Sequence, residues 1–407
     1  MKTGPRAPKS AWKSASGSNS VAMVSWAALL SMFSAVFISI MWEMYNQPPK
    51  VEVQKNETYK YPSFVLDFDA ELEERERLAE YYGATVDPGV ERRSGLSLEE
   101  FWDLYDAKWP VIVTDVVPKW PAYQKWTKEF LNSTYGKERV VMVATKGKLE
   151  DKEGMSLPLF GFVEHTSESS PDYWTYLNDE LFITTRPQLR KDVLTSIYTE
   201  EDFFQLFPRE IRPWDCMLLW GTAHSRSTLH IDPYNWTGTN AVFWGTKKWK
   251  LFPPGQDHLL YVFQNQKCGF PLDCFKYNSP IDTFASKPET QKKYPNFQSA
   301  RWIEVEQKAG EILIIPTGWF HQAYNAEETL AVSGQMMNRN NFRYVLEEIF
   351  KAGNLQRKQL PEGFHNLLPP DQVTILMSLL PRKILRKGKT LTDEYLKQVN
   401  EGTGGIR

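Results

Sequence analysis

The segment Leu229–Pro233, with the sequence Leu-His-Ile-Asp-Pro, is the part of the chain on which the prediction of fold and chemistry depends. Side chains alternate along a β-strand, so a strand here would place His230 and Asp232 on one face. A second segment, residues 316–321, reads Pro-Thr-Gly-Trp-Phe-His and supplies another histidine from a later strand. Two histidines and one carboxylate form the facial triad of non-haem Fe(II) enzymes, which leaves coordination positions open. We therefore expect His230, Asp232 and His321 to be the metal ligands and the catalytic centre.

The residues around both segments predict strands. An apolar run, Met217–Trp220, precedes the first segment, and residues 242–249 are predicted to form a hairpin after it. A turn at Gly310 followed by a strand from Glu311 to Ile315 leads into His321. Short apolar runs separated by Gly, Pro and Asn are typical of an antiparallel barrel. If His321 merely packed beside its tryptophan neighbour, the matching context of the two segments would be unexplained.

The order of these motifs resembles the JmjC branch of the cupin-type dioxygenases, and is similar to the small JmjC hydroxylases that include a lysyl hydroxylase also described as an arginine demethylase. The similarity extends from about Phe101 to about Asn338. It implies a mainly β fold, a double-stranded β-helix (cupin or jelly-roll) barrel with flanking helices. Besides the histidine segments, the similarity is carried by residues 110–113, 119–121, 126–127, 135–136, 240, 247 and 251–253.

The resemblance implies Fe(II), 2-oxoglutarate and O₂ as metal, cosubstrate and oxidant. Lys247 stands where this branch keeps the cation for the far carboxylate of 2-oxoglutarate, and a lysine can serve there as a point charge. Asn240 matches a second cosubstrate-binding position of the family, and its amide can donate to a carboxylate oxygen. Ser333 occupies a place where the family often has threonine, and Ser227 is in a similar position, so the resemblance makes either hydroxyl a candidate donor to the cosubstrate. Lys248 is expected to be exposed, on the other face of the strand.

Other pocket residues are less well defined by the sequence. The family commonly contributes a tyrosine from an earlier strand, but residues 159–162, Leu-Phe-Gly-Phe, fall near that place and have no hydroxyl. His224 is close in sequence to His230 and could line the pocket. The candidates to line its mouth are Tyr234, Trp236, Trp244, Trp319 and Phe320, of which Trp244 and Phe320 are better explained as core residues.

These features favour an enzyme that hydroxylates, or by the same step demethylates, a protein side chain. The alternative is a catalytically inactive lumenal binding or scaffold protein that keeps the barrel. A third reading, a nuclear demethylase, would require a localisation signal, for which residues 382–389 are the candidate. The chain of 407 residues has 48 basic and 50 acidic residues, a formal charge of −2. Such a balance gives no reason to expect a nucleic-acid partner.

Residues 21–42 contain no charged residue. A helix of that length rises about 33 Å, enough to cross the roughly 30 Å core of a bilayer. A cleaved signal peptide is the competing reading, but its apolar region is normally shorter. The residues before this stretch include Lys2, Arg6, Lys9 and Lys13 and no acidic residue, which favours a cytosolic N-terminus. We therefore expect a single-pass type II membrane protein of the endomembrane system (ER or Golgi) with a lumenal catalytic domain.

The predicted organisation has five parts: a cytosolic N-terminus (1–20), a transmembrane signal anchor (21–42), a stem and charged helix (43–95), the oxygenase domain (96–340) and a C-terminal helical region (341–407). Ser97 and Glu100 form a capping box that predicts a helix start. The C-terminal helices are expected to pack on the barrel or to form a homodimer contact.

Cysteines and glycosylation sequons give further expectations. Cys268 and Cys274 could close a small loop in an oxidising lumen, whereas Cys216 is expected to be a buried free thiol. The sequons at Asn56 and Asn132 fit surface sites, and Asn235 is expected to be unmodified because it lies so close to Asp232.

Overall fold

The computed structural model describes residues 89–145, 149–265 and 276–401. The expected signal anchor at 21–42, most of the predicted stem, Asn56 and the Cys268–Cys274 pair lie outside these residues. Within the described part of the chain, no helix is both long and apolar enough to cross a membrane.

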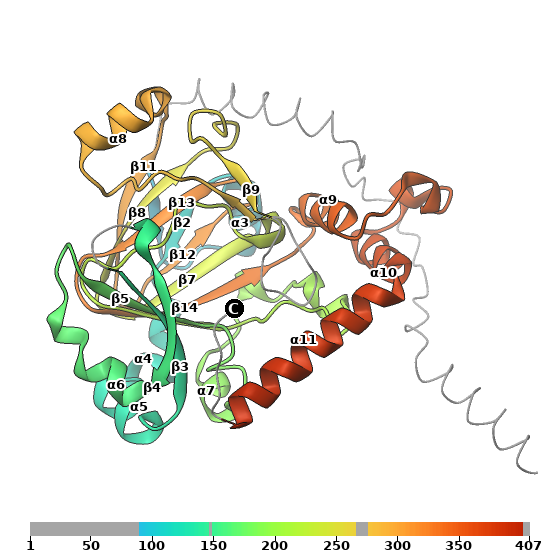
Figure 1. The fold of residues 1–407 in the computed structure, drawn as a ribbon. Helices are drawn as coiled ribbons and strands as arrows, with labels where there is room; N and C mark the ends of the chain where they lie inside the picture. Colours follow the sequence, from blue (N-terminus) through green and yellow to red (C-terminus); the bar gives the residue numbers. More distant parts are fainter. Residues whose placement is uncertain (1–88, 146–148, 266–275, 402–407) are drawn as a thin grey trace, which may run out of the picture. The chain divides into compact units, whose positions relative to one another are not determined.

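The described residues form a nine-stranded and a three-stranded sheet that face each other, with a separate two-stranded pair, β9 and β10, and Figure 1 shows the three-stranded sheet above the nine-stranded one. The larger sheet has nine strands in the order β1-β2-β12-β7-β14-β6-β5-β3-β4, and the smaller has the order β11-β8-β13. Apart from the parallel β1–β2 pair, neighbouring strands in both sheets are antiparallel. This confirms the prediction of a mainly β, cupin-like fold with flanking helices.

The strand bounds are β1 Glu91–Arg93, β2 Val111–Val113, β3 Arg139–Thr145, β4 Glu153–Pro158, β5 Trp174–Asp179, β6 Met217–Gly221, β7 Thr237–Trp244, β8 Thr246–Phe252, β9 Phe263–Asn265, β10 Lys276–Asn278, β11 Ile303–Lys308, β12 Ile312–Ile315, β13 Phe320–Asn325 and β14 Thr329–Met336. Strands β9 and β10 pair with each other.

Strand β12 shows why the central strands are apolar on both faces. Ile312 and Ile314 belong to the core on the helix-covered side of the larger sheet, whereas Leu313 and Ile315 belong to the core between the two sheets. Because alternate side chains enter different cores, the strand is a continuous apolar run.

The predicted hairpin over residues 242–249 is wrong. Strand β7 pairs with β12 and β14, while β8 pairs with β11 and β13 in the other sheet. The chain crosses between the sheets at Gly245, which has a φ of +85°. A Cβ atom here would lie 2.4 Å from the Glu328 carbonyl oxygen, so the crossing requires glycine.

Two groups of helices flank the sheets. Helices α3 (Leu98–Leu104), α4 (Pro121–Lys125), α5 (Lys128–Tyr135), α6 (Leu159–Glu164) and α7 (Pro187–Asp192) contribute to the core on the outer face of the larger sheet, and Figure 1 shows α4 to α7 beside β3 and β4. Helix α3 begins with the predicted capping box at Ser97. Helix α8 (Lys287–Lys293) precedes β11.

The C-terminal region is helical, as predicted, with α9 (Phe342–Ala352), α10 (Pro369–Leu379) and α11 (Arg382–Glu401). Residues of α9 and α10 share an apolar cluster with Tyr234 and Trp236, which follow the first histidine segment. The helices therefore pack on the barrel, and a homodimer contact stays a prediction.

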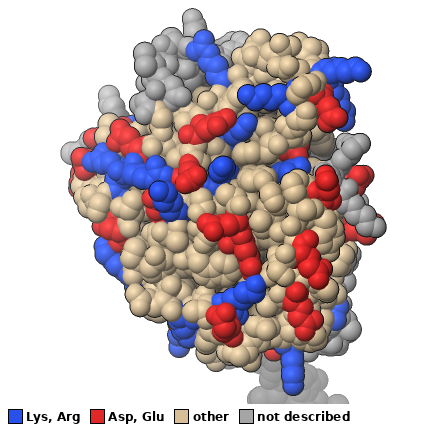
Figure 2. Space-filling model, turned by 90° about the vertical axis from the view of Figure 1, so that its left-hand side faces the viewer, with Lys and Arg blue, Asp and Glu red and all other residues tan. Residues whose placement is uncertain are grey.

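Charge on the visible surface is mixed. Figure 2 shows acidic and basic side chains interspersed among uncharged ones on one face, in keeping with the formal charge of −2.

Candidate active site

His230 and His321 lie opposite each other across a short backbone bridge. The amide of His230 donates to the carbonyl of His321 (3.1 Å), and the amide of His321 donates back (2.9 Å). Their ring centroids are 4.5 Å apart. His321 belongs to β13, whereas His230 forms only isolated bridges outside the named strands.

The prediction of one strand carrying both His230 and Asp232 is therefore wrong. Asp232 is the N-cap of a 3-10 helix, η6 (Pro233–Asn235). Proline has no amide hydrogen with which to continue a strand ladder, which favours this change of direction. The turn nevertheless brings the Asp232 carboxylate toward both imidazole rings.

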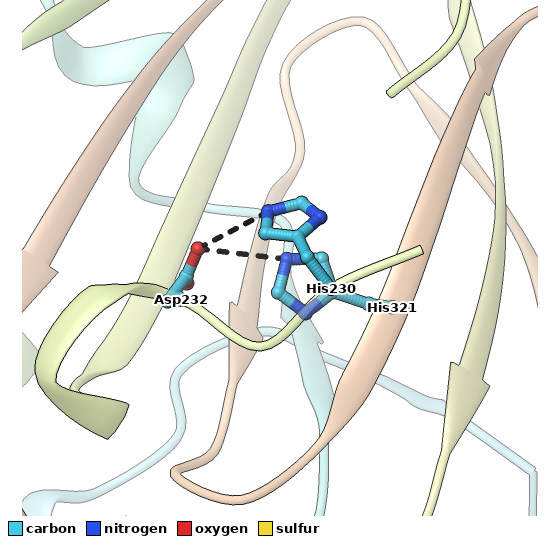
Figure 3. Close-up of side chains that lie close together, drawn as sticks. All are labelled: His230, Asp232 and His321. Carbon is cyan, nitrogen blue, oxygen red and sulfur yellow. Dashed lines mark ion pairs between the residues drawn. The ribbon is translucent and has the colours of Figure 1, made fainter. Parts of the chain in front are cut away.

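The three side chains meet as Figure 3 shows, with Asp232 Oδ1 3.6 Å from Nε2 of each histidine. One ligand atom from each residue lies within 4.8 Å of the others. His230 Nδ1 lies 2.8 Å from the Thr228 carbonyl oxygen, and His321 Nδ1 lies 3.1 Å from that of Trp319. Since a carbonyl only accepts, Nδ1 carries the hydrogen and the Nε2 lone pair faces the carboxylate.

The electrostatics of the triad suit a divalent cation. Burial lowers the pKa of His321 to about 4, so this ring is neutral at pH 7. Burial alone would raise the pKa of Asp232, but His321 and His230 outweigh it and hold that pKa below its usual value. Neutral imidazoles and an ionised carboxylate are the forms that bind metal.

Gly238, on β7, provides the space for the Asp232 carboxylate. A Cβ atom on Gly238 would lie 2.1 Å from Asp232 Oδ2. Any larger residue would therefore displace the ligand.

A cavity of about 300 Å³ adjoins the triad and is lined by residues of both sheets. Lys247, on β8, lines it and is fully buried. Its Nζ lies 5.7 Å from the Trp249 ring centroid and 5.9 Å from that of Tyr176. Burial lowers the pKa of Lys247 to about 7.

Lys247 Nζ has no hydrogen-bond partner among the described residues, and neither has the side-chain oxygen of Asn240 on β7. Buried polar groups are normally paired, so these two atoms indicate a site built for a missing polar ligand. An anionic group at Lys247 fits, because it would compensate a cation buried at high cost. Lys248 is exposed, as predicted.

The two predicted serines also line the cavity, but their hydroxyls are engaged with the protein. Ser333 Oγ donates to the Thr239 carbonyl at 3.2 Å. Ser227 Oγ donates to the Thr228 carbonyl at 3.0 Å and accepts from the Ala323 amide at 3.0 Å. Both hydroxyls thus hold strands together at the cavity wall.

The tyrosine that sequence reasoning missed is Tyr176, on β5. It lines the cavity beside Lys247, and burial raises the pKa of its phenol, which therefore remains a neutral donor. Residues 159–162, near the place where the family resemblance predicts a tyrosine, lie instead in helix α6 on the outer face of the sheet. The sequence feature that could have identified Tyr176 is the apolar run Trp174–Asp179, which forms a strand whose neighbouring residues Tyr176 and Leu177 enter different cores.

Of the predicted mouth residues, only Trp236 lines the cavity, together with Trp214 and Trp249. Tyr234 and Trp319 are core residues, so their assignment to the mouth is wrong. Trp244 and Phe320 pack in cores, as expected. His224 does not line this cavity either: its Nδ1 lies 2.7 Å from the hydroxyl of Tyr324.

The remaining cysteine and sequon predictions can be assessed within the described residues. Cys216 is a buried free thiol, as expected. Asn235 is only 7% exposed, which agrees with its prediction as an unmodified sequon. Asn132 is half-buried near the end of α5.

A cupin-like barrel with two histidines and one carboxylate beside a buried lysine defines the facial-triad class of metal-dependent oxygenase folds. The family model of the cupin-like domain matches residues 97–336. The chain belongs to the JmjC 2-oxoglutarate oxygenase family of cupin-like proteins.

Curated relatives agree with this assignment. The chain is 30% identical over 266 residues to the lysine-specific demethylase JMJ21 of Arabidopsis thaliana, which covers 65% of the chain and 27% of the relative. It is 26% identical over 263 residues to the bifunctional arginine demethylase and lysyl-hydroxylase psr-1 of Caenorhabditis elegans, an alignment that covers 64% of the chain and 63% of the relative. It is 32% identical over 169 residues to the 2-oxoglutarate and iron-dependent oxygenase JMJD4 of Gallus gallus, an alignment that covers 41% of the chain and 36% of the relative. In each case the chain covers less than two thirds of the relative.

Proposed function

We propose that this chain is an Fe(II)- and 2-oxoglutarate-dependent oxygenase that hydroxylates a protein side chain. The observation that carries the proposal is the fully buried Lys247 Nζ, which has no hydrogen-bond partner among the described residues and lies in the cavity that adjoins the triad. A structural metal site alone would not require a buried cation beside it.

The residues divide into two groups. His230, Asp232 and His321 would hold Fe(II). Lys247 would bind the far carboxylate of 2-oxoglutarate, with Tyr176 and the Asn240 amide as further donors in the same cavity. When bound, the metal and cosubstrate supply the oxidative decarboxylation of 2-oxoglutarate and the transfer of one oxygen atom of O₂ to a substrate carbon. The chain's own part is to orient the reactants and to exclude water.

A protein side chain is the proposed substrate class. One of the relatives is named a lysine-specific demethylase, and another is named both an arginine demethylase and a lysyl-hydroxylase. The two activities share a step, because removal of an N-methyl group begins with hydroxylation of that methyl carbon. Trp214 and Trp236 in the cavity wall offer apolar surface to an entering side chain.

A cavity without a tyrosine near the cosubstrate position would favour the inactive scaffold. Tyr176 lines the cavity beside Lys247, which removes that argument. We therefore favour the enzyme.

The test is succinate formation by the full-length chain with Fe(II), ascorbate and 2-oxoglutarate, with and without a protein extract as a source of substrate. We expect extract-stimulated succinate in the wild type and in Lys248→Met, and none above background in Asp232→Ala. Equal succinate in the wild type and Asp232→Ala, with both variants folded, would contradict the proposal.

We further propose that the protein is a type II membrane protein with its oxygenase domain in the lumen of the endomembrane system. The uncharged stretch at residues 21–42 and the basic residues before it support this topology. Protease treatment of intact microsomes should leave a C-terminal tag protected, and its digestion there would contradict the topology without bearing on the enzyme.

A further inference from the structure

We propose that Asn235 is a positioning residue that ties the turn carrying Asp232 to the turn carrying His321, so that the ligand set is already assembled before metal binds. This inference rests on the proposed function only in taking the triad as the metal site. The observation is a direct link between two segments that are far apart in the sequence and supply all three ligands.

The link has two hydrogen bonds. The amide of Gly318 donates to Asn235 Oδ1 at 2.6 Å, and the Thr317 hydroxyl donates to the carbonyl of Asn235. Both Asn235 and Thr317 are buried, at 7% and 5% exposure. Buried hydrogen bonds of this kind are costly to break, because the partner left behind is not hydrated.

Each end of the link is a short turn closed by a backbone hydrogen bond. The amide of Asn235 donates to the carbonyl of Asp232 at 3.0 Å, which closes the turn after the ligand. On the other side, Gly318 has a φ of +81° in a turn closed by the amide of Trp319 and the carbonyl of Pro316 (3.3 Å). His321 follows three residues after Gly318, so little chain separates either ligand from the link.

The backbone at the link is unusual. Tyr234 and Asn235 both lie in the left-handed region, with φ of +55° and +56°. Asparagine tolerates this region better than most residues, and tyrosine does not favour it. A strained turn persists only where its surroundings fix it, and here the Asn235 side chain is one of the groups that do so.

Asparagine at this position therefore has two separable roles. Its backbone accepts a left-handed conformation, which glycine would accept as readily. Its side-chain oxygen binds Gly318, which glycine cannot do. The variant Asn235→Gly removes the side-chain hydrogen bond to Gly318 without imposing backbone strain, and it keeps the backbone carbonyl that accepts from Thr317. Asn235→Asp keeps an acceptor oxygen at the place of Oδ1.

A matched control exists at Asn354. It also has a left-handed φ, +50°, but it is exposed and follows α9. Asn354→Gly makes the same chemical change in the same backbone region, away from the ligands.

The experiment measures Co(II) affinity of the full-length apo-protein by calorimetry and the visible absorption spectrum of the Co(II) complex, together with the melting temperature of the metal-free form. We expect Asn235→Gly to weaken Co(II) binding about tenfold, equivalent to about 1.4 kcal/mol, and to alter the spectrum. The Co(II) affinity of Asn235→Asp should stay within about threefold of that of wild type, and the affinity of Asn354→Gly should equal that of wild type.

Two results would overturn the inference. One is an Asn235→Gly protein with a lower melting temperature but unchanged Co(II) affinity and spectrum, since a purely structural role predicts this. The other applies if Asn235→Gly does not fold. The test variant is then Thr317→Val, which removes only the second hydrogen bond, and Co(II) affinity equal to that of wild type would overturn the inference. If wild type itself bound no Co(II), or if His230→Ala bound it equally well, the metal site and with it the proposed function would fail instead.

Discussion

Replacing Lys247 by methionine should make the protein more stable and, at the same time, unable to bind 2-oxoglutarate well. Lys247 is fully buried, its Nζ has no partner among the described residues, and burial lowers its pKa from 10.5 to about 7. Methionine has a similar length and no charge, so it can fill the same space between Tyr176 and Trp249.

The magnitude follows from the pKa. Each tenfold change in the dissociation constant corresponds to about 1.4 kcal/mol, so lowering the pKa from 10.5 to about 7 costs the folded state about 5 kcal/mol. Because the unfolded chain keeps its proton up to about pH 10.5, this cost is complete below pH 7 and disappears as the pH rises toward 10.5. The stability advantage of the methionine variant should thus shrink by about 2 kcal/mol between pH 7 and pH 9, because the folded-state lysine is already half deprotonated at pH 7.

The assay is denaturant unfolding of the apo-protein at both pH values, paired with calorimetry of 2-oxoglutarate binding to the metal-loaded protein. We expect affinity to fall about a hundredfold, as a charge-assisted hydrogen bond is worth about 1.5–3 kcal/mol. Lys248→Met, at the exposed neighbouring lysine, should change neither quantity. A Lys247→Met protein that is no more stable than wild type at pH 7, or whose advantage does not vary with pH, would refute the reasoning about burial.

Three further predictions concern single residues. Gly238→Ala should weaken Co(II) binding at least about tenfold, because its Cβ would lie 2.1 Å from the Asp232 carboxylate. Gly161→Ala, in α6, is the control. Equal Co(II) affinity in wild type, Gly238→Ala and Gly161→Ala would contradict the close approach of Gly238 to Asp232. Tyr176→Phe should raise the KM for 2-oxoglutarate severalfold in the succinate assay but leave Co(II) affinity unchanged, and a loss of metal binding would assign the phenol a different role. Asp106, 1% exposed, has its pKa raised to about 6 by burial, so its contribution to stability is present below pH 3.8 and is lost as the pH rises through 6. Denaturant unfolding should show wild type losing about 2 kcal/mol relative to Asp106→Asn between pH 4 and pH 7. A stability difference between the two proteins that does not vary with pH would show that Asp106 does not titrate in this range.

The parts of the site that the sequence predicted well are those fixed by local pattern. The spacing of His230, Asn240 and Lys247 along one stretch of chain could be compared directly with the family. The face of each strand residue also follows from alternation, which is why Lys247 is buried and Lys248 exposed.

What the sequence missed depends on which strands pair. The glycine at position 245, between two strand-like runs, looks like a hairpin turn, although the chain crosses there to the other sheet. Tyr176 was missed for the same reason: β5 lies beside the site only because it pairs with β6 in the larger sheet. Such long-range pairings have no local signature in a single sequence.

The turn at Asp232 also connects the site to the C-terminal helices. On one side of it, Asn235 binds the Thr317–Gly318 turn; on the other, Tyr234 is buried in the apolar cluster that contains Val345 and Ile349 of α9. The family model ends at residue 336, before α9 begins at Phe342. In this chain, therefore, the packing that fixes a metal ligand includes residues beyond the matched domain, and substitutions in α9 should influence the metal site through Tyr234 without contacting it.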